Sequence, residues 1–152
     1  MKDNEKERIL KLIKNKAAEA QKRDDLCARS TMYGLSCYFD FISDEIVSAT
    51  FNLSGGIGAS SGTCGVFASA QLAIGLKYSP SIKETNTKLS KKKIAENKMI
   101  EFREIFLDEF GSVLCPEIHK QIFGRSFDFK NREEAREFFN ITDHAEKCAK
   151  VV

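Results

Sequence analysis

Apolar residues recur at intervals of three and four along most of the 152-residue chain, without the sustained alternation that marks a half-buried strand. Near the N-terminus, Ile9, Leu12 and Ile13 fall on one helical face, and lysine and glutamate fill the other faces. The pattern predicts an all-α fold, a single-domain bundle of about six to eight helices that takes in residues 1–152. The expected helices cover residues 5–22, 26–42, 44–54, 63–78, 83–110, 116–123, 131–140 and 142–151.

A glycine-rich segment, residues 54–62, interrupts this pattern with four glycines in nine positions. Such a density of glycine favours positive φ angles or close backbone approach, so we expect a loop here. The small, apolar residues that follow predict a central buried helix over 63–78. The loop ends in Gly62-Thr63-Cys64 and lacks the lysine of a phosphate-binding P-loop, which argues against nucleotide binding.

The charge balance and the apolar content limit the partners of the chain. Lys and Arg number 24 against 22 Asp and Glu, whereas nucleic-acid binders usually carry a strong basic excess. The longest nearly apolar stretch, 66–76, is too short to cross a bilayer, which takes about 20 residues. We therefore expect a cytoplasmic protein that binds neither nucleic acid nor membrane. The amphipathic N-terminal helix within residues 1–22 is a candidate interface, and a homodimer is one possible assembly.

The chain has five cysteines: Cys27, Cys37, Cys64, Cys115 and Cys148. In a reducing compartment an odd set of this kind serves as core filler, as metal ligands or in redox chemistry, rather than as a disulfide framework. Since no Cys-x-x-Cys occurs, only the fold can bring the sulfurs together. Cys64 stands near the start of its expected helix, where a helix N-terminus lowers a thiol pKa. Alternatively, it is a small core residue.

Two histidines stand at helical spacing from cysteines. His119 follows Cys115 by four residues, and His144 precedes Cys148 by four. Each pair would share one helical face, and two such pairs could form an S₂N₂ zinc site. The interpretation that we favour is simpler, with both histidines as partly exposed helix residues.

Several stretches of the chain have an order and spacing known from one protein family. They are 26–28, 52–58, 62–65, 73–78, 106–112 with Cys115, and Cys148. Together they resemble the redox-active protein family named for its four-cysteine pattern, C_GCAxxG_C_C. The resemblance extends from about residue 17 to residue 152. Val66 and Ser69 differ from the family's central motif, which has alanine and glycine at these positions.

The resemblance implies an all-helical fold in which Cys27, Cys64, Cys115 and Cys148 are the family's four cysteines. Cys37 would be an additional, structural cysteine. Four thiolates are the usual ligand set of both [2Fe–2S] and [4Fe–4S] clusters. Our leading hypothesis is therefore that the four cysteines bind an iron–sulfur cluster for electron transfer or redox sensing, with a redox partner that the sequence does not identify.

Two glycines are assigned to the same hypothetical site. Gly56 in the loop and Gly65 after Cys64 would help to hold the cofactor, because backbone N–H groups of a glycine loop can donate to the sulfurs and tune their potential. One alternative is metal-free thiol–disulfide exchange, with Cys64 as the catalytic, low-pKa thiol and another cysteine resolving. A second is a structural zinc or interaction module. Whether the chain is an enzyme stays open.

Overall fold

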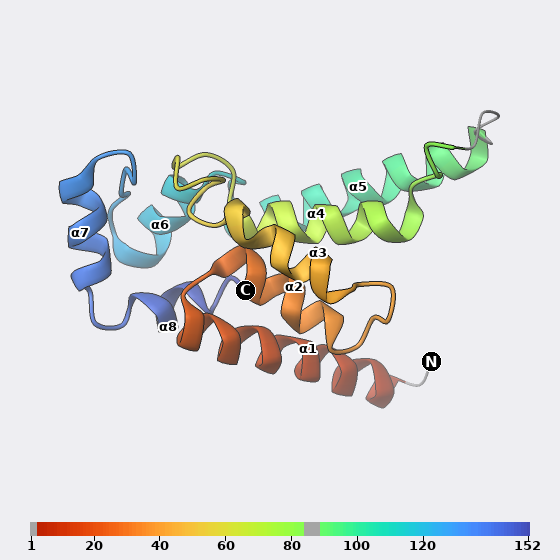
Figure 1. Cartoon of the computed structure of the whole chain (residues 1–152), viewed down its shortest axis with the longest axis horizontal. Coiled ribbons are helices and arrows are strands. Elements are labelled where there is room, and N and C mark those ends of the chain that lie inside the picture. The colour runs from red at the N-terminus through yellow and green to blue at the C-terminus, as the bar shows by residue number, and fades with distance from the viewer. Residues whose placement is uncertain (1–2, 84–88) are drawn as a thin grey trace.

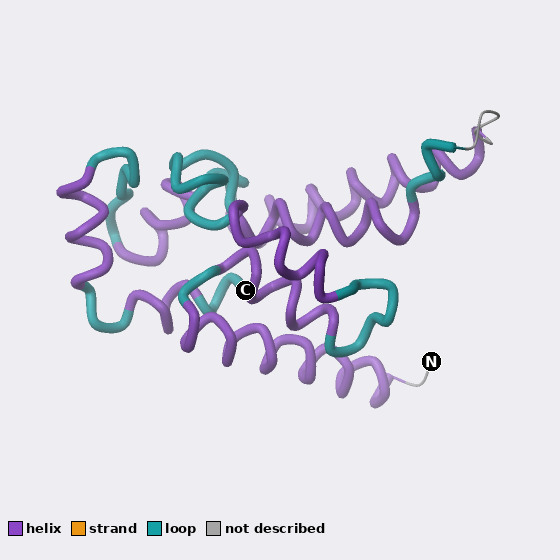
Figure 2. The backbone as a smooth tube through the Cα atoms, in the orientation of Figure 1, coloured by secondary structure: helices purple, strands orange, loops and turns teal. Residues whose placement is uncertain are grey.

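The computed structural model describes residues 3–83 and 89–152, and within these ranges it is helical without a strand (Figure 2). The prediction of an all-α fold is therefore confirmed. The elements in chain order are α1 (Asp3–Asp24), α2 (Cys27–Ser36), α3 (Asp44–Ala49), the 3₁₀ helix η1 (Thr50–Leu53), α4 (Gly65–Tyr78), α5 (Leu89–Phe110), α6 (Cys115–Phe123), α7 (Arg132–Asn140) and α8 (His144–Cys148).

The helices form two groups that meet where α8 packs against α1 (Figure 1). In one group α1 packs along α2, and α2 packs against α3 and α4. In the other, α6 packs against α8, and α8 returns to α1. The C-terminal half of α1 is therefore packed inside its own chain, with Ala17, Ala20 and Gln21 buried, whereas Leu12 of its apolar stripe is 42% exposed. Gly34 allows α2 this close approach, because a Cβ there would lie 2.6 Å from the Cβ of Ala17.

Several helices are shorter than the sequence pattern predicts. The segment expected to be helical over 26–42 leaves the helix after Ser36, and residues 37–42 form turns. The helical spacing continues into these turns because Phe39 and Ile42 pack on the same apolar cluster as Met32 of α2. The last predicted helix is also reduced, to the five residues of α8. Residues 84–88, within the helix predicted over 83–110, lie outside the described residues.

The central helix α4 is buried on one face. Gly65, Val66 and Ser69 are buried, whereas Leu72 and Leu76 are about 40% exposed. The expectation of a buried helix at the centre thus holds for the face toward α2. Among the described residues, no helix is long and apolar enough to span a membrane.

Candidate functional site

Three of the cysteines stand at the N-terminal ends of helices. Cys27 is the first residue of α2, Cys64 is the N-cap of α4, and Cys115 is the first residue of α6. The first turn of a helix has backbone N–H groups without helical partners, and it is the positive end of the helix dipole. Each of these thiols therefore lies where a helix favours negative charge.

A short antiparallel bridge holds the starts of α4 and α6 side by side. The N–H of Cys64 donates to the carbonyl of Val113 (2.7 Å), and the N–H of Cys115 donates to the carbonyl of Gly62 (2.8 Å). The pairing depends on backbone groups alone, so the sequence carries no obvious sign of it. It makes neighbours of two cysteines that lie about fifty positions apart in the chain.

Gly65 brings the start of α4 against Cys27. A Cβ on Gly65 would lie 2.9 Å from the Cys27 sulfur and 2.7 Å from the carbonyl oxygen of Leu53. One turn later, Ser69 is fully buried and its hydroxyl donates to the carbonyl of Ala28 in α2 (2.9 Å). Serine in place of the family's glycine therefore keeps α2 and α4 close, with a hydrogen bond across the contact.

His119 lies between the remaining pair of thiols. Its Nε2 is 3.7 Å from the sulfur of Cys115 and 4.0 Å from that of Cys148, which ends α8. The ring is only 5% exposed, so the interpretation of His119 as a partly exposed residue is wrong. Four phenylalanines enclose it: Phe123, Phe127, Phe129 and Phe138.

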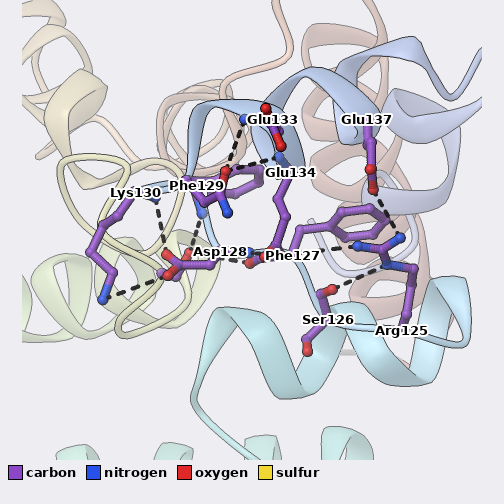
Figure 3. Close-up of polar contacts among 11 residues, drawn as sticks. Arg125, Ser126, Phe127, Asp128, Phe129, Lys130, Glu133, Glu134 and Glu137 are labelled. Atoms are coloured by element: carbon purple, nitrogen blue, oxygen red, sulfur yellow. Dashed lines mark hydrogen bonds and ion pairs between the residues drawn. The ribbon is translucent and has the colours of Figure 1, made fainter.

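Polar contacts hold this aromatic enclosure in place (Figure 3). The guanidinium of Arg125 lies 4.6 Å from the centre of the Phe127 ring and pairs with Glu137 of α7 at 2.9 Å. The hydroxyl of Ser61 accepts from the N–H of Phe129 (2.8 Å) and donates to the carbonyl of Phe127 (3.2 Å). The glycine-rich loop is thereby tied to the segment that covers His119.

His144 does not complete a zinc site with Cys148. Its Nε2 contacts a carboxylate oxygen of Asp25 at 2.7 Å, and its Nδ1 contacts the carbonyl of Ile141 at 2.6 Å. Both ring nitrogens are therefore engaged, and the S₂N₂ arrangement is not formed. Within residues 3–83 and 89–152, no three His, Cys, Asp or Glu side chains are placed to hold one metal ion.

The four family cysteines influence one another electrostatically. Burial, with a smaller contribution from nearby Cys27, raises the pKa of the Cys64 thiol to about 11, against the opposing N–H groups of Phe67 and Val66. Burial also raises the pKa of Cys115, with contributions from the other three thiols. The expectation of a lowered pKa at Cys64 is therefore wrong, because desolvation outweighs the helix N-terminus.

Cys148 and Cys37 contrast in their surroundings. Burial raises the pKa of Cys148, and Cys27, Asp25 and Cys64 add to the rise. Cys37 is exposed at the end of α2, so it is not packed in the core. All five cysteines carry free thiols.

The loop acts on Cys27 through Gly55 rather than Gly56. Burial raises the pKa of Cys27, while the N–H of Gly55 and the hydroxyl of Ser54 oppose the rise by donating toward its sulfur. Gly56 instead closes the loop at a φ of +77°, and its carbonyl accepts from the N–H of Gly62 (2.9 Å). A Cβ at Gly56 would lie 2.4 Å from that nitrogen, so glycine is required there.

A cavity of about 450 Å³ adjoins the thiols. Cys27, Cys115 and Cys148 line it together with His119 and Gln21. Among the described residues, two buried side-chain atoms have no hydrogen-bond partner, Nδ1 of His119 and Oε1 of Gln21. The sequence pointed to His119 through its helical spacing from Cys115, whereas nothing in the sequence pointed to Gln21.

The described residues thus form an all-helical chain with four neighbouring thiols, two buried and two half-buried, and three of the four line one cavity. The chain belongs to the family described as "Putative redox-active protein (C_GCAxxG_C_C)", whose model matches residues 26–152. This match confirms the resemblance noted in the sequence, and it leaves all of α1 outside the shared region. No curated protein and no solved structure shows a significant match.

Proposed function

We propose that this protein is a redox protein in which Cys27, Cys64, Cys115 and Cys148 together bind an iron–sulfur cluster. The observation that carries the proposal is the grouping of four free thiols, two buried and two half-buried, three of them at helix N-termini and three lining one cavity. Cysteine thiolates are the usual cluster ligands, and four complete the set. One-electron transfer or redox sensing would be the chemistry that a bound cluster supplies.

The charges of the site support thiolate ligands that are stabilised by a metal. Burial and mutual repulsion leave the metal-free thiols protonated at neutral pH. Bound iron would replace these protons, which couples binding to proton release. The three helix N-termini, the N–H of Gly55 and the hydroxyl of Ser54 would then stabilise the negative charge that remains.

The room beside the thiols suits a cluster better than a single ion. With metal–sulfur distances near 2.3 Å, the ligands of one tetrahedral zinc lie within about 4 Å of one another. Ligands that bind more than one iron stand farther apart. The cavity beside Cys27, Cys115 and Cys148, about 450 Å³, offers room for a group larger than one ion.

The same burial argues against simple thiol–disulfide exchange. Exchange begins with attack by a thiolate, and its rate depends on the thiolate fraction. With a pKa of about 11, Cys64 is almost entirely protonated at neutral pH. We place this chemistry in the cytoplasm, because its reducing conditions keep thiols free. The redox partner is unidentified.

Anaerobic reconstitution with ferrous iron and sulfide tests the proposal. The natural chain should gain visible absorption, whereas Cys27→Ser, Cys64→Ser, Cys115→Ser and Cys148→Ser variants should each lose most of it. Cys37→Ser is the matched control and should behave as the natural chain does, because its thiol is exposed and away from the cavity. Equal absorption in all five variants, stoichiometric zinc in place of iron, or a single titratable disulfide would each overturn the proposal.

A further inference from the structure

Helix α5 has one main neighbour. It packs chiefly against α4, and the two helices reach out side by side from the rest of the molecule (Figure 1). Of the residues of α5, all of them described, only Phe106 is buried. Ile94 and Ile105 are 51% and 58% exposed. Exposed apolar residues that share one side of a helix with complementary charges can mark a contact with another chain.

One flank of α5 has the spacing of a coiled-coil seam. Six residues follow one another at intervals of three and four, and at about 100° per residue they share one side of the helix. They are Lys91, Ile94, Lys98, Glu101, Ile105 and Asp108. The flank lies roughly a quarter turn from Phe102 and Phe106, which contact Phe67 of α4. This seam is therefore separate from the α4 contact.

The seam is antisymmetric in charge about its midpoint, which lies between residues 99 and 100. Lys98 and Glu101 stand equally far from that point, and so do Lys91 and Asp108. Ile94 and Ile105 are equidistant as well, so the apolar positions mirror each other while the charges reverse. Over the whole helix, residues 89–99 hold four lysines and one glutamate, and residues 100–110 hold four acidic residues and one arginine.

This antisymmetry makes the seam complementary to itself when it is reversed. We propose that the seam of α5 binds the same seam of a second copy in antiparallel orientation, about a twofold axis at the midpoint. Each Lys98 then faces Glu101 of the second copy, each Lys91 faces Asp108, and each Ile94 faces Ile105. A parallel arrangement would place like charges together and is disfavoured.

Charge dominates this interface because only two isoleucine pairs are apolar. Within one chain Lys98 and Glu101 form an ion pair at 2.7 Å, and both stay about half exposed, so both charges are presented on the seam. The association should weaken as salt rises, since exposed charges are screened. The dimer needs none of the four cysteines of the proposed site, and its existence is independent of the proposed cluster.

Sedimentation velocity over a range of protein concentrations tests the dimer with two charge reversals. Lys98→Glu alone and Glu101→Lys alone should each weaken self-association roughly thirtyfold, because each turns two attractions into two repulsions. An equimolar mixture of the two variants should restore it, because the glutamate introduced in one variant then faces the lysine introduced in the other. Lys93→Glu and Glu104→Lys make the same charge changes on α5 outside the seam and should leave the association unchanged.

The mixture separates a specific seam from a general effect of charge or folding. Helical circular dichroism of each variant should match that of the natural chain, since Lys93, Glu101 and Glu104 are exposed and Lys98 is about half exposed. A natural chain that stays monomeric at all concentrations would overturn the proposal. So would control variants that weaken association as much as the seam variants, or a mixture that fails to recover.

Discussion

Gly65 occupies the tightest contact in the four-cysteine site, and Gly65→Ala tests whether that contact is essential. The new Cβ would lie 2.7 Å from the carbonyl oxygen of Leu53, 2.9 Å from the Cys27 sulfur and 3.0 Å from the Cβ of Ala28. Comfortable carbon contacts are about 3.5 to 4.0 Å. Relief requires α4 to move away from α2 and η1, because one of the three obstacles is a backbone atom.

The size of the effect follows from two opposing contributions. Overpacking of a close contact typically costs about 1 to 3 kcal/mol, whereas replacing glycine by alanine in a helix gains up to about 1 kcal/mol. We expect a net loss of roughly 1 to 2 kcal/mol in the free energy of unfolding. Because the movement separates Cys27 from Cys64, iron binding should also fall.

Gly75→Ala provides the matched control in the same helix. A Cβ there meets nothing within 4 Å, so this variant should be more stable than the natural chain by roughly 0.5 to 1 kcal/mol. Urea denaturation of both metal-free variants gives the comparison. If Gly65→Ala proves as stable as Gly75→Ala, the contact between α4 and Cys27 does not constrain the site, and the reasoning is refuted.

Three further outcomes are expected. Burial lowers the pKa of His119 to about 4, so the unfolded chain binds a proton at this histidine more readily than the folded chain does. The free energy of unfolding of the metal-free protein should therefore fall by up to about 3 kcal/mol as pH falls from about 6.5 to 4. Denaturation of His119→Phe across this range should lack that dependence, and an unchanged slope would contradict the assignment. Ser69→Ala should lower the free energy of unfolding by about 1 kcal/mol, because the hydrogen bond to the Ala28 carbonyl is lost. Urea denaturation measures this, and an unchanged free energy would contradict the role given to that bond. A thiol reagent at neutral pH should label Cys37 rapidly and the other four cysteines slowly until the metal-free chain is unfolded, whereas fast labelling of all five would contradict their protection.

Helical periodicity predicted the class of fold because most helices here bury one face. It placed the C-terminal end of α5 correctly, where Gly111 follows at positive φ. It failed over residues 37–42, because Phe39 and Ile42 reach the core from turns at helical spacing. Apolar side chains stabilise a packed core whatever backbone conformation brings them to it.

The candidate site was less accessible to sequence reasoning, because its chemistry depends on tertiary burial. The position of Cys64 at a helix start was foreseen, yet its pKa rises because the surrounding core excludes water. The burial of His119 depends on phenylalanines that follow it in the sequence, the last of which is Phe138. The loop's glycines predicted positive φ angles, but the same conformation at Ile57 and Ala59 had no local signal.

Iron and acid-labile sulfide per chain, measured after anaerobic purification of the natural protein, test the central claim most directly. We expect iron and sulfide in equal amounts, two or four of each, on Cys27, Cys64, Cys115 and Cys148. Metal-free protein with four protected thiols that take up no iron on reconstitution would contradict it.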